Sequence, residues 1–261
     1  MGRDGARGAG RAAPLAALVS LVLDFVYPPI CLACDGLFSR GEELVCPECW
    51  RAASRPAARV RSLDAAVAVR AAVAAGPTLF AILHEAKYRG RRELLDPLGA
   101  LLARCVAADE TLCRAELFVP VPLHPCRLRE RGYNQSEILA RAAAGAARPH
   151  GAARAHGAPR VHGPASLGEP DCAAVAGRLL IRSRDTRPQA RLPEAGRLAN
   201  VRGAFRMSSR RPPTAPLGRV VIVDDVVTSG ATALECARVL LDAGAEEVSV
   251  LALVAGAARP R

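Results

Sequence analysis

The stretch VVIVDDVVTSGAT, residues 220–232, is the segment from which the fold class can be predicted. An apolar, β-branched run over 219–223 predicts a buried strand that ends at two adjacent aspartates. Helical spacing follows over 231–243, Gly244 stops that helix, and 248–254 predicts a second apolar strand. Strands that are apolar throughout are typical of a parallel sheet covered on both faces. The sequence therefore predicts an α/β protein.

The composition of the chain allows a large aliphatic core and points toward anionic partners. Of 261 residues, 51% are hydrophobic and only 3% are aromatic, so the core must be built mainly from aliphatic side chains. The formal net charge is +11, which favours nucleic acids or phosphorylated small molecules as partners. A solvated basic surface without a partner is an equal alternative. Lys87 is the only lysine, so nearly all the positive charge is arginine.

The N-terminal region and one internal segment are expected to lie outside the main folded domain. Residues 1–13 predict a disordered basic tail. A helix is expected to open at Pro14, and the two prolines at 28–29 close it. Its apolar run lacks a small-residue cleavage site and is too short to span a bilayer, so we expect a cytoplasmic protein. Residues 148–171, rich in Gly, Ala, Pro and His, predict a low-complexity surface insertion.

The remaining sequence predicts alternating strands and helices. Residues 65–73 favour a strand over a helix, because a Gly-Pro pair follows them. Residues 117–125 predict a buried strand that runs into a proline-stiffened turn. Helices are expected over 78–88, 93–107 and 136–147.

Two CxxC pairs, CLAC at 31–34 and CPEC at 46–49, are separated by eleven residues. Each pair presents two thiolates on a tight turn, and Zn²⁺ in structural sites is held tetrahedrally by four such ligands. We therefore predict a closed, structural zinc site made by Cys31, Cys34, Cys46 and Cys49. Two disulfides are the alternative, which a cytoplasmic location disfavours. The other cysteines are expected to be core residues: Cys105, Cys113, Cys126, Cys172 and Cys236.

Three kinds of protein place paired acids after an apolar strand. A P-loop NTPase would need a GxxxxGK[ST] segment, and the single lysine does not lie in one. A receiver domain would need several βα units after the acids, but only 36 residues follow Asp225. The stretch instead resembles the ribose-phosphate site of type I phosphoribosyltransferases.

The chemistry of these residue types agrees with that resemblance. Two carboxylates can accept hydrogen bonds from the vicinal hydroxyls of a ribose. A hydroxyl-rich turn before a helix offers backbone N–H groups to a phosphate, and a glycine lets the backbone approach it closely. The alternative without a ligand is that the hydroxyl residues only cap the following helix and that the two acids are solvated. The predicted binding residues are Asp224, Asp225, Thr228, Ser229, Gly230, Ala231 and Thr232.

Over about 20–145 and 175–256 the chain resembles the ComF family of competence proteins. The segments that carry the resemblance are YPPICLAC (27–34), CPECW (46–50), KYRG (87–90), PVPLHPCRLRERGYNQSEILAR (120–141) and QARLPEAGRLANVRGAF (189–205). The resemblance implies a zinc ribbon within 14–60, preceded by the tail, and a type I phosphoribosyltransferase domain over 61–261. The 148–171 insertion interrupts the family pattern between a helix and a strand.

The resemblance also implies a ligand, phosphoribosyl pyrophosphate (PRPP), and roles for further residues. Leu123 and His124 would lie in the turn that holds the pyrophosphate. A mobile loop with Arg127, Arg129 and Arg131 would close over the substrate and neutralise the leaving pyrophosphate; a solvated charged loop is the alternative. Tyr133 and Asn134 would contact ribose or base. Magnesium would be chelated mainly by PRPP, with the two aspartates as outer partners. Residues of the hood that selects the acceptor would be Gln189, Arg197, Asn200 and Phe205.

Two functions of different class follow from these features. The first is a phosphoribosyltransferase-like protein that binds PRPP with magnesium and works in DNA uptake, as the family resemblance implies, with transferase activity toward a nitrogen acceptor left open. The second is a non-catalytic accessory protein that binds nucleic acid and uses the fold as a scaffold or nucleotide sensor. Single-stranded DNA and helicase-like proteins are the partners that the family resemblance implies. A third possibility is a zinc-stabilised scaffold that binds no ligand. The presence of the complete acid pair and loop argues against it.

Overall fold

A six-stranded sheet organises the chain in a computed structural model, which describes residues 30–38, 44–57, 60–148, 173–184, 194–209 and 216–256. The strand order is β1-β2-β8-β7-β3-β4, and all neighbours are parallel except β1 and β2. A second, antiparallel sheet pairs β5 (Leu180–Arg182) with β6 (Phe205–Met207). The six strands are β1 Val60–Ser62, β2 Ala68–Val73, β3 Leu117–Pro120, β4 Ala174–Val175, β7 Gly218–Val227 and β8 Ala245–Ala255.

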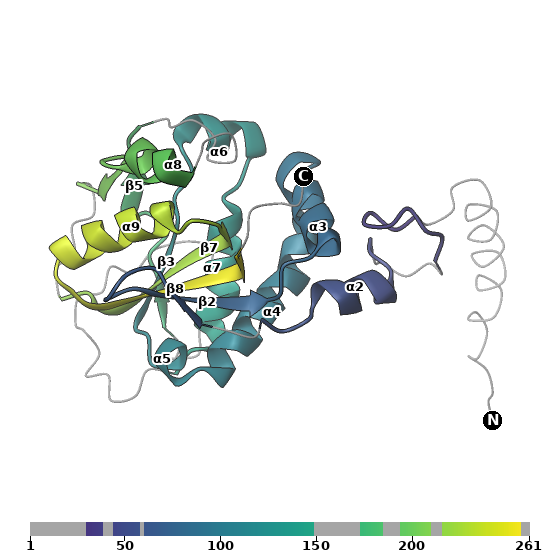
Figure 1. The fold of residues 1–261 in the computed structure, drawn as a ribbon, viewed down its shortest axis with the longest axis horizontal. Helices are drawn as coiled ribbons and strands as arrows, with labels where there is room; N and C mark the ends of the chain where they lie inside the picture. Colours follow the sequence, from purple (N-terminus) through teal and green to yellow (C-terminus); the bar gives the residue numbers. More distant parts are fainter. Residues whose placement is uncertain are drawn as a thin grey trace, which may run out of the picture.

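Helices cover both faces of the larger sheet (Figure 1). One face packs against α3, α4 and α7, and the other against α9 and the smaller β5-β6 sheet. The helices are α2 Pro47–Ala53, α3 Pro77–Tyr88, α4 Leu95–Ala108, α5 Glu110–Cys113, α6 Pro125–Arg131, α7 Gln135–Ala146, α8 Glu194–Val201 and α9 Ala231–Asp242, with a 3₁₀ turn at Arg92–Leu94. The α/β class with a mostly parallel sheet is therefore confirmed.

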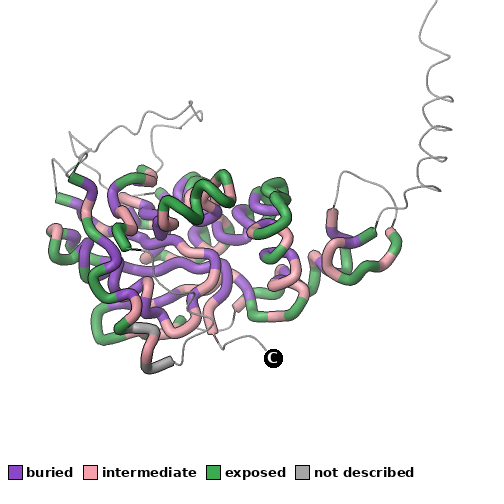
Figure 2. Tube along the Cα trace, turned by 90° about the horizontal axis from the view of Figure 1, so that it is seen from above, coloured by how far each residue is buried: buried purple, intermediate pink, exposed green. Residues whose placement is uncertain are grey.

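The central strand β7 is apolar at successive positions because both of its faces are covered by other elements. In β7, Val221 and Val223 face the cluster of α3, α4 and α7, whereas Val220 and Ile222 face the cluster of α9. This alternation follows from the two-residue period of a strand. Figure 2 shows buried segments running through the middle of the domain, with exposed segments around them. A side chain on β7 therefore belongs to one helix layer or the other according to its parity.

Most expected elements are present, with shifted ends. The strand expected over 65–73 is β2, and the three expected helices are α3, α4 and α7. The strand expected over 219–223 is longer: β7 continues to Val227, because β8 pairs with it up to Val227–Ala255. The strand expected in 117–125 is shorter, because β3 ends at Pro120.

The segment expected to be a mobile loop is instead the short helix α6. Pro125 occupies its first turn, His124 Nδ1 accepts a hydrogen bond from Cys126 N at 3.4 Å, and Gly132 ends it at φ 79°. Proline at a helix start and a left-handed glycine at its end are the usual boundary signals, so the helix was readable from sequence. The predicted tail 1–13, the predicted helix from Pro14 and residues 149–171 of the predicted insertion lie outside the described residues.

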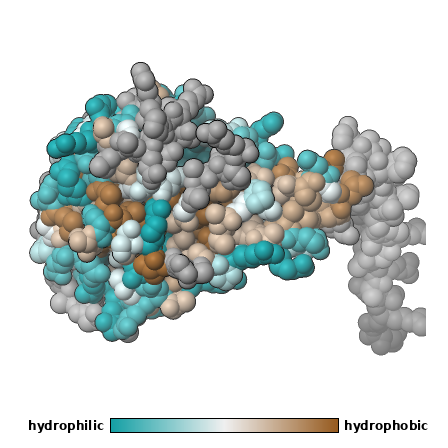
Figure 3. All heavy atoms as spheres, viewed as in Figure 1, coloured by the Kyte–Doolittle hydropathy of each residue, from teal (hydrophilic) through white to brown (hydrophobic). Residues whose placement is uncertain are grey.

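The cysteine module joins the domain through α2 and α3. Cys31, Cys46 and Cys49 belong to the same buried cluster as Leu79 and Ile82 of α3. Figure 3 shows pale-brown to brown residues running from the domain toward this end of the molecule. The module therefore shares a core with the larger domain. No helix in the described ranges is long and apolar enough to cross a bilayer.

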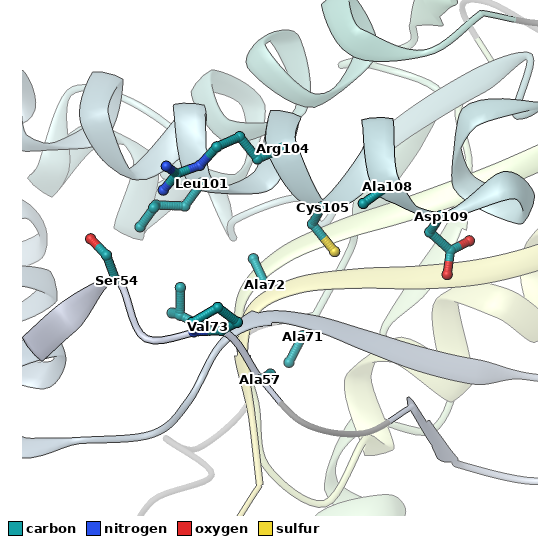
Figure 4. A pocket seen from close by; sticks show the side chains of 11 residues that line it. Ser54, Ala57, Ala71, Ala72, Val73, Leu101, Arg104, Cys105, Ala108 and Asp109 are labelled. Carbon is teal, nitrogen blue, oxygen red and sulfur yellow. The ribbon is translucent and has the colours of Figure 1, made fainter. Parts of the chain in front are cut away.

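A cavity of about 470 Å³ lies where the linker after α2 passes the edge of the sheet. Ser54 and Ala57 of the linker, the end of β2 and the helix α4 form its walls, and Arg104 and Cys105 point from α4 (Figure 4). None of its lining residues belongs to the acid pair or to the loop that follows it. The cavity is thus separate from the predicted ribose-phosphate site.

Candidate functional site

The two adjacent aspartates lie where β7 runs past the end of its neighbour β3. The last β3 pair is Pro120 with Val223, and Val121 N donates to Val223 O at 2.9 Å before the chain leaves the sheet. Asp224 and Asp225 come directly after this point, still paired with β8. The acids thus stand at the carboxyl edge of the sheet, where parallel α/β proteins bind ligands.

The two aspartates have different partners, although both partners come from helices that pack on the same face of the sheet. Asp225 shares the parity of Val223 and forms an ion pair with Lys87, at the end of α3. Asp224 accepts hydrogen bonds from Ser136 Oγ at 3.1 Å and from the backbone N–H of Asp225 at 2.9 Å. Three elements, β7, α3 and the start of α7, therefore meet at the acid pair.

The environment makes one of the two acids hard to ionise. Desolvation is the largest influence on Asp224, followed by the negative charge of Asp225, and together they raise the pKa of Asp224 to about 7. Lys87 and the two hydrogen bonds oppose this rise without cancelling it. Buried carboxylates beside a like charge titrate late because the charged form is disfavoured. Near neutral pH the site thus holds a carboxyl poised between its two protonation states.

The loop after the acids has the geometry that close approach to an anion requires. Gly230 has φ 84° and precedes α9, whose first residues are Ala231 and Thr232. A Cβ at Gly230 would lie 2.3 Å from the Cδ2 atom of Leu63, so no other residue fits without displacement. Thr228 and Ser229 lead into this turn, as expected, and the N-terminus of α9 supplies positive dipole beside it.

The strand β1 covers that loop from outside, which sequence analysis missed. Arg61 Nη2 donates to the carbonyl oxygen of Thr228 at 2.6 Å. Its Nε atom is buried and has no hydrogen-bond partner among the described atoms. Nothing in the sequence separates Arg61 from the many other arginines, because only the pairing of β1 with β2 brings it to the loop.

The three arginines predicted to act on pyrophosphate are on α6 and do not reach the acid pair. Arg127 pairs with Glu130 at 2.8 Å, and Arg129 donates to Cys126 Sγ at 3.3 Å. Arg131 donates to Gln135 Oε1 and lies over the ring of Tyr88 at 5.5 Å. Arg127 and Arg129 are exposed, whereas Arg131 is partly buried. In this state the three arginines therefore contact groups on α6 or close to it, and none of these contacts is with the acid pair.

The other predicted contact residues support the site from its rim. Tyr133 donates through its hydroxyl to the carbonyl of Ala86, next to Lys87. Asn134 caps α7 through Ser136 N at 3.1 Å and donates to the Val121 carbonyl at 3.0 Å. The partly buried residues Leu123 and His124 lie in the turn between β3 and α6, and their contact with a pyrophosphate stays a prediction. Tyr133 and Asn134 thus hold the surrounding elements together.

The residues predicted for the hood are dispersed. Phe205 is 3% exposed and packs in the α9 cluster, with Arg182 over its ring at 5.4 Å, so it is a core residue. Asn200 lies near the end of α8, and its carbonyl accepts from Arg184 at 3.1 Å. Gln189 and the side chain of Arg197 lie outside the described parts.

The four predicted metal-ligating cysteines form one cluster. Their sulfur atoms all lie within 4.8 Å of one another, and Cys34 Sγ is 3.9 Å from Cys46 Sγ. Four thiolates around one zinc ion would be separated by roughly 3.8 Å, since Zn–S bonds are about 2.3 Å long. The cysteines therefore fit a closed tetrahedral structural zinc site.

The backbone favours thiolate at one of the four cysteines. Cys31 Sγ accepts N–H groups from Ala33 at 3.4 Å and from Cys46 at 3.3 Å. Burial is the largest single influence and raises the pKa of Cys31, but these donors and that of Cys34 outweigh it and lower the pKa to about 7. At Cys49, burial and the neighbouring cysteines raise the pKa instead. Because zinc binds thiolate and not thiol, the surroundings of Cys31 favour metal binding.

We expect the zinc site to stabilise the whole chain, because its cysteines share a core with α3. Protein purified under reducing conditions should hold about one zinc per chain by metal analysis, and a chelator should lower its melting temperature. Cys46→Ser should lose the zinc, whereas Cys126→Ser, which changes an exposed thiol elsewhere, should retain it. Equal zinc content in both variants would contradict the assignment.

Asp224→Asn should make stability less dependent on pH. The folded pKa near 7 exceeds the ordinary value of 3.8, so the wild type loses stability as pH rises from about 4 to 7. Asp224→Asn lacks this loss, so at pH 8 its free energy of unfolding should exceed that of the wild type by about 1–3 kcal/mol. Chemical denaturation at pH 5 and pH 8 measures it. The control is Glu246→Gln, an exposed carboxylate on β8, and a variant that follows the wild type at both pH values would refute the assignment.

Two family models match this chain. A double zinc ribbon domain matches residues 22–60, which contain the four cysteines. A phosphoribosyl transferase domain matches residues 183–261, which contain the acid pair, the loop and α9.

Curated relatives align with a larger part of this chain than either family model. DNA utilization protein YhgH of Salmonella typhimurium is 32% identical over 180 residues, which are 68% of this chain and 67% of the relative. The Escherichia coli K12 protein of that name is 30% identical over 233 residues, 86% and 89% of the two chains. Competence protein F of Haemophilus influenzae is 28% identical over 138 residues, 53% of this chain and 49% of its own. The chain therefore belongs to the ComF family of competence and DNA utilization proteins, with a zinc ribbon followed by a phosphoribosyltransferase domain.

Proposed function

We propose that this protein binds PRPP with magnesium at the acid pair and the 228–232 loop, and that it works in DNA uptake or utilisation. The observation that carries the proposal is the arrangement at the carboxyl end of β7. Two carboxylates are followed by a turn with a glycine at φ 84° and by the N-terminus of α9. This order matches a ribose diol followed by its 5-phosphate. The relatives named for DNA utilisation and competence support the biological setting.

Each part of the ligand has a chemically suited partner in the proposal. Asp224 and Asp225 accept hydrogen bonds from the ribose hydroxyls, and the turn from Thr228 to Thr232 holds the 5-phosphate through backbone N–H groups. The turn at Leu123 and His124 faces the pyrophosphate. Magnesium prefers oxygen ligands and binds mostly through substrate phosphates, so the aspartates are its outer partners.

Transferase activity is the catalytic form of this proposal. It requires the arginines of α6 to move toward the pyrophosphate, because in the described state they pair with Glu130, Cys126 and Gln135. Charge neutralisation of the leaving group is the main electrostatic requirement of such a displacement. A protein that binds the ligand without this movement would be a sensor of PRPP or of a related nucleotide.

Calorimetric titration of PRPP with magnesium tests the proposal. The wild type should bind, and the Asp224→Asn/Asp225→Asn variant should lose at least about tenfold in affinity, because each lost charged hydrogen bond costs roughly 1.5–3 kcal/mol. The Glu246→Gln/Glu247→Gln variant, with two carboxylates on exposed β8 positions, should bind like the wild type. Absence of wild-type binding in zinc-loaded, folded protein would overturn the proposal.

A second candidate function, binding of single-stranded DNA, is favoured by one surface. Tyr88 is 65% exposed at the end of α3, and Arg89, Arg91 and Arg92 follow it in exposed positions. Arg131 lies over the ring of Tyr88. Aromatic rings beside arginines are used to stack bases and to bind phosphates of single strands. This surface and the net charge of +11 are compatible with a DNA partner, alone or beside a helicase-like protein.

Salt dependence separates DNA binding from coincidental basicity. The affinity for a single-stranded oligonucleotide should fall linearly on a log–log plot against salt, with a slope of about −0.7 per phosphate contact. Replacing Arg89, Arg91 and Arg92 by glutamine should reduce that slope by about 2, whereas Asp224→Asn/Asp225→Asn should leave it unchanged. If the DNA affinity of the wild type did not change with salt concentration, the high arginine content would reflect a bias in amino-acid usage and not a DNA-binding role.

A further inference from the structure

Lys87 is an exception in this chain, because 36 basic residues include only this lysine. It lies at one of the few places where a basic side chain is mostly buried: its side chain is 19% exposed, and that of its partner Asp225 is 6% exposed. Lysine presents a compact charge with three donors, whereas arginine presents a wide planar fork. At this mostly buried position beside a carboxylate, the compact ammonium needs less room than the planar guanidinium fork would.

The position of Lys87 joins the acid pair to the segment that contains α6. Lys87 pairs with Asp225 on one side. On the other side, Tyr133 donates to the carbonyl of Ala86, and Arg131 lies over Tyr88, so the neighbours of Lys87 contact the end of α6 and a residue just after it. The 228–232 loop is held from a different direction, by Arg61 and Leu63. Lys87 therefore lies on the pyrophosphate side of the site, away from the 5-phosphate side.

The ammonium of Lys87 can also donate more hydrogen bonds than its ion pair uses. It carries three N–H groups, and within the described ranges its ion-pair partner is the single oxygen Oδ2 of Asp225. In a ribose, the carbon that bears the pyrophosphate is adjacent to the carbon that bears the 2-hydroxyl. In the proposed function the acid pair accepts from both ribose hydroxyls, so a cation beside the pair lies near the carbon that bears the pyrophosphate.

We propose that Lys87 is a substrate-binding residue that contacts the pyrophosphate of the ligand while it remains paired with Asp225. This inference rests on the proposed function and adds a specificity to it. Lys87 makes the site favour a ribose pyrophosphate over ribose 5-phosphate. In the free protein the same ammonium offsets the charge of the acid pair, which keeps Asp225 fixed at the end of β7.

Two ligands distinguish this role from a purely structural one. Calorimetry with magnesium is carried out on PRPP and on ribose 5-phosphate. Lys87→Met should weaken PRPP binding by about tenfold to a hundredfold, the loss expected for a charged hydrogen bond, and change ribose 5-phosphate binding by less than about threefold. Lys87→Arg, which keeps the charge, should weaken PRPP binding less than Lys87→Met. Arg114→Met, an equal charge change at an exposed position before β3, should leave both affinities unchanged.

The other outcomes overturn the inference in distinguishable ways. Equal weakening of both ligands by Lys87→Met would show that the residue acts only through Asp225, and no weakening would show that it has no role. If the wild type binds neither ligand, the proposed function itself has failed. Melting curves establish that each variant is folded. Should Lys87→Met not fold, Lys87→Met/Asp225→Asn removes the unpaired carboxylate and is compared with Asp225→Asn alone: equal PRPP affinity in these two would refute the contact.

Discussion

Two neighbouring carboxylates at the end of a buried strand are the constraint on which the rest of the site depends. Ionised acids in a partly desolvated place are unfavourable unless cations and hydrogen-bond donors surround them. Here the compensation comes from Lys87 on α3 and from Ser136 at the start of α7. The packing of α3 and α7 on one face of the sheet thus also fixes the electrostatics of the acid pair.

That dependence connects the zinc ribbon to the site through α3. The cysteine cluster packs with α2 and the buried side of α3, and the last turn of α3 carries Lys87. The ribbon and the helix that carries Lys87 therefore belong to one packed core.

Much of the fold and part of the site could be predicted because the signals were local. The alternation of apolar strands and amphipathic helices follows from residue patterns over ten or so positions, and the two CxxC pairs fix four ligands by spacing alone. The turn with Gly230 was predictable for the same reason, since one residue type fits its backbone. Even α6, wrongly expected to be a loop, has local boundary signals at Pro125 and Gly132 that outweigh the impression given by its charges.

Contacts between distant segments were not predictable. In the sequence, Lys87 stands out only as the single lysine. Its pairing with Asp225 joins residues that the chain separates by more than half its length. Arg61 reaches the 228–232 loop across 167 positions. Arginines 127, 129 and 131 could be identified by type, but their partners in the described state depend on how α6 packs.

The sequence by itself thus determined the α/β class, the four zinc ligands and the acid-and-glycine loop, because strand period, ligand spacing and backbone freedom are properties of short segments. Only the tertiary structure decided which charges meet. The pairing of Asp225 with Lys87, of Asp224 with Ser136 and of Arg61 with the loop depends on strand order and on which face each helix covers. Electrostatic interactions act through space between segments far apart in the chain, so the protonation and specificity of the site are properties of the assembled fold.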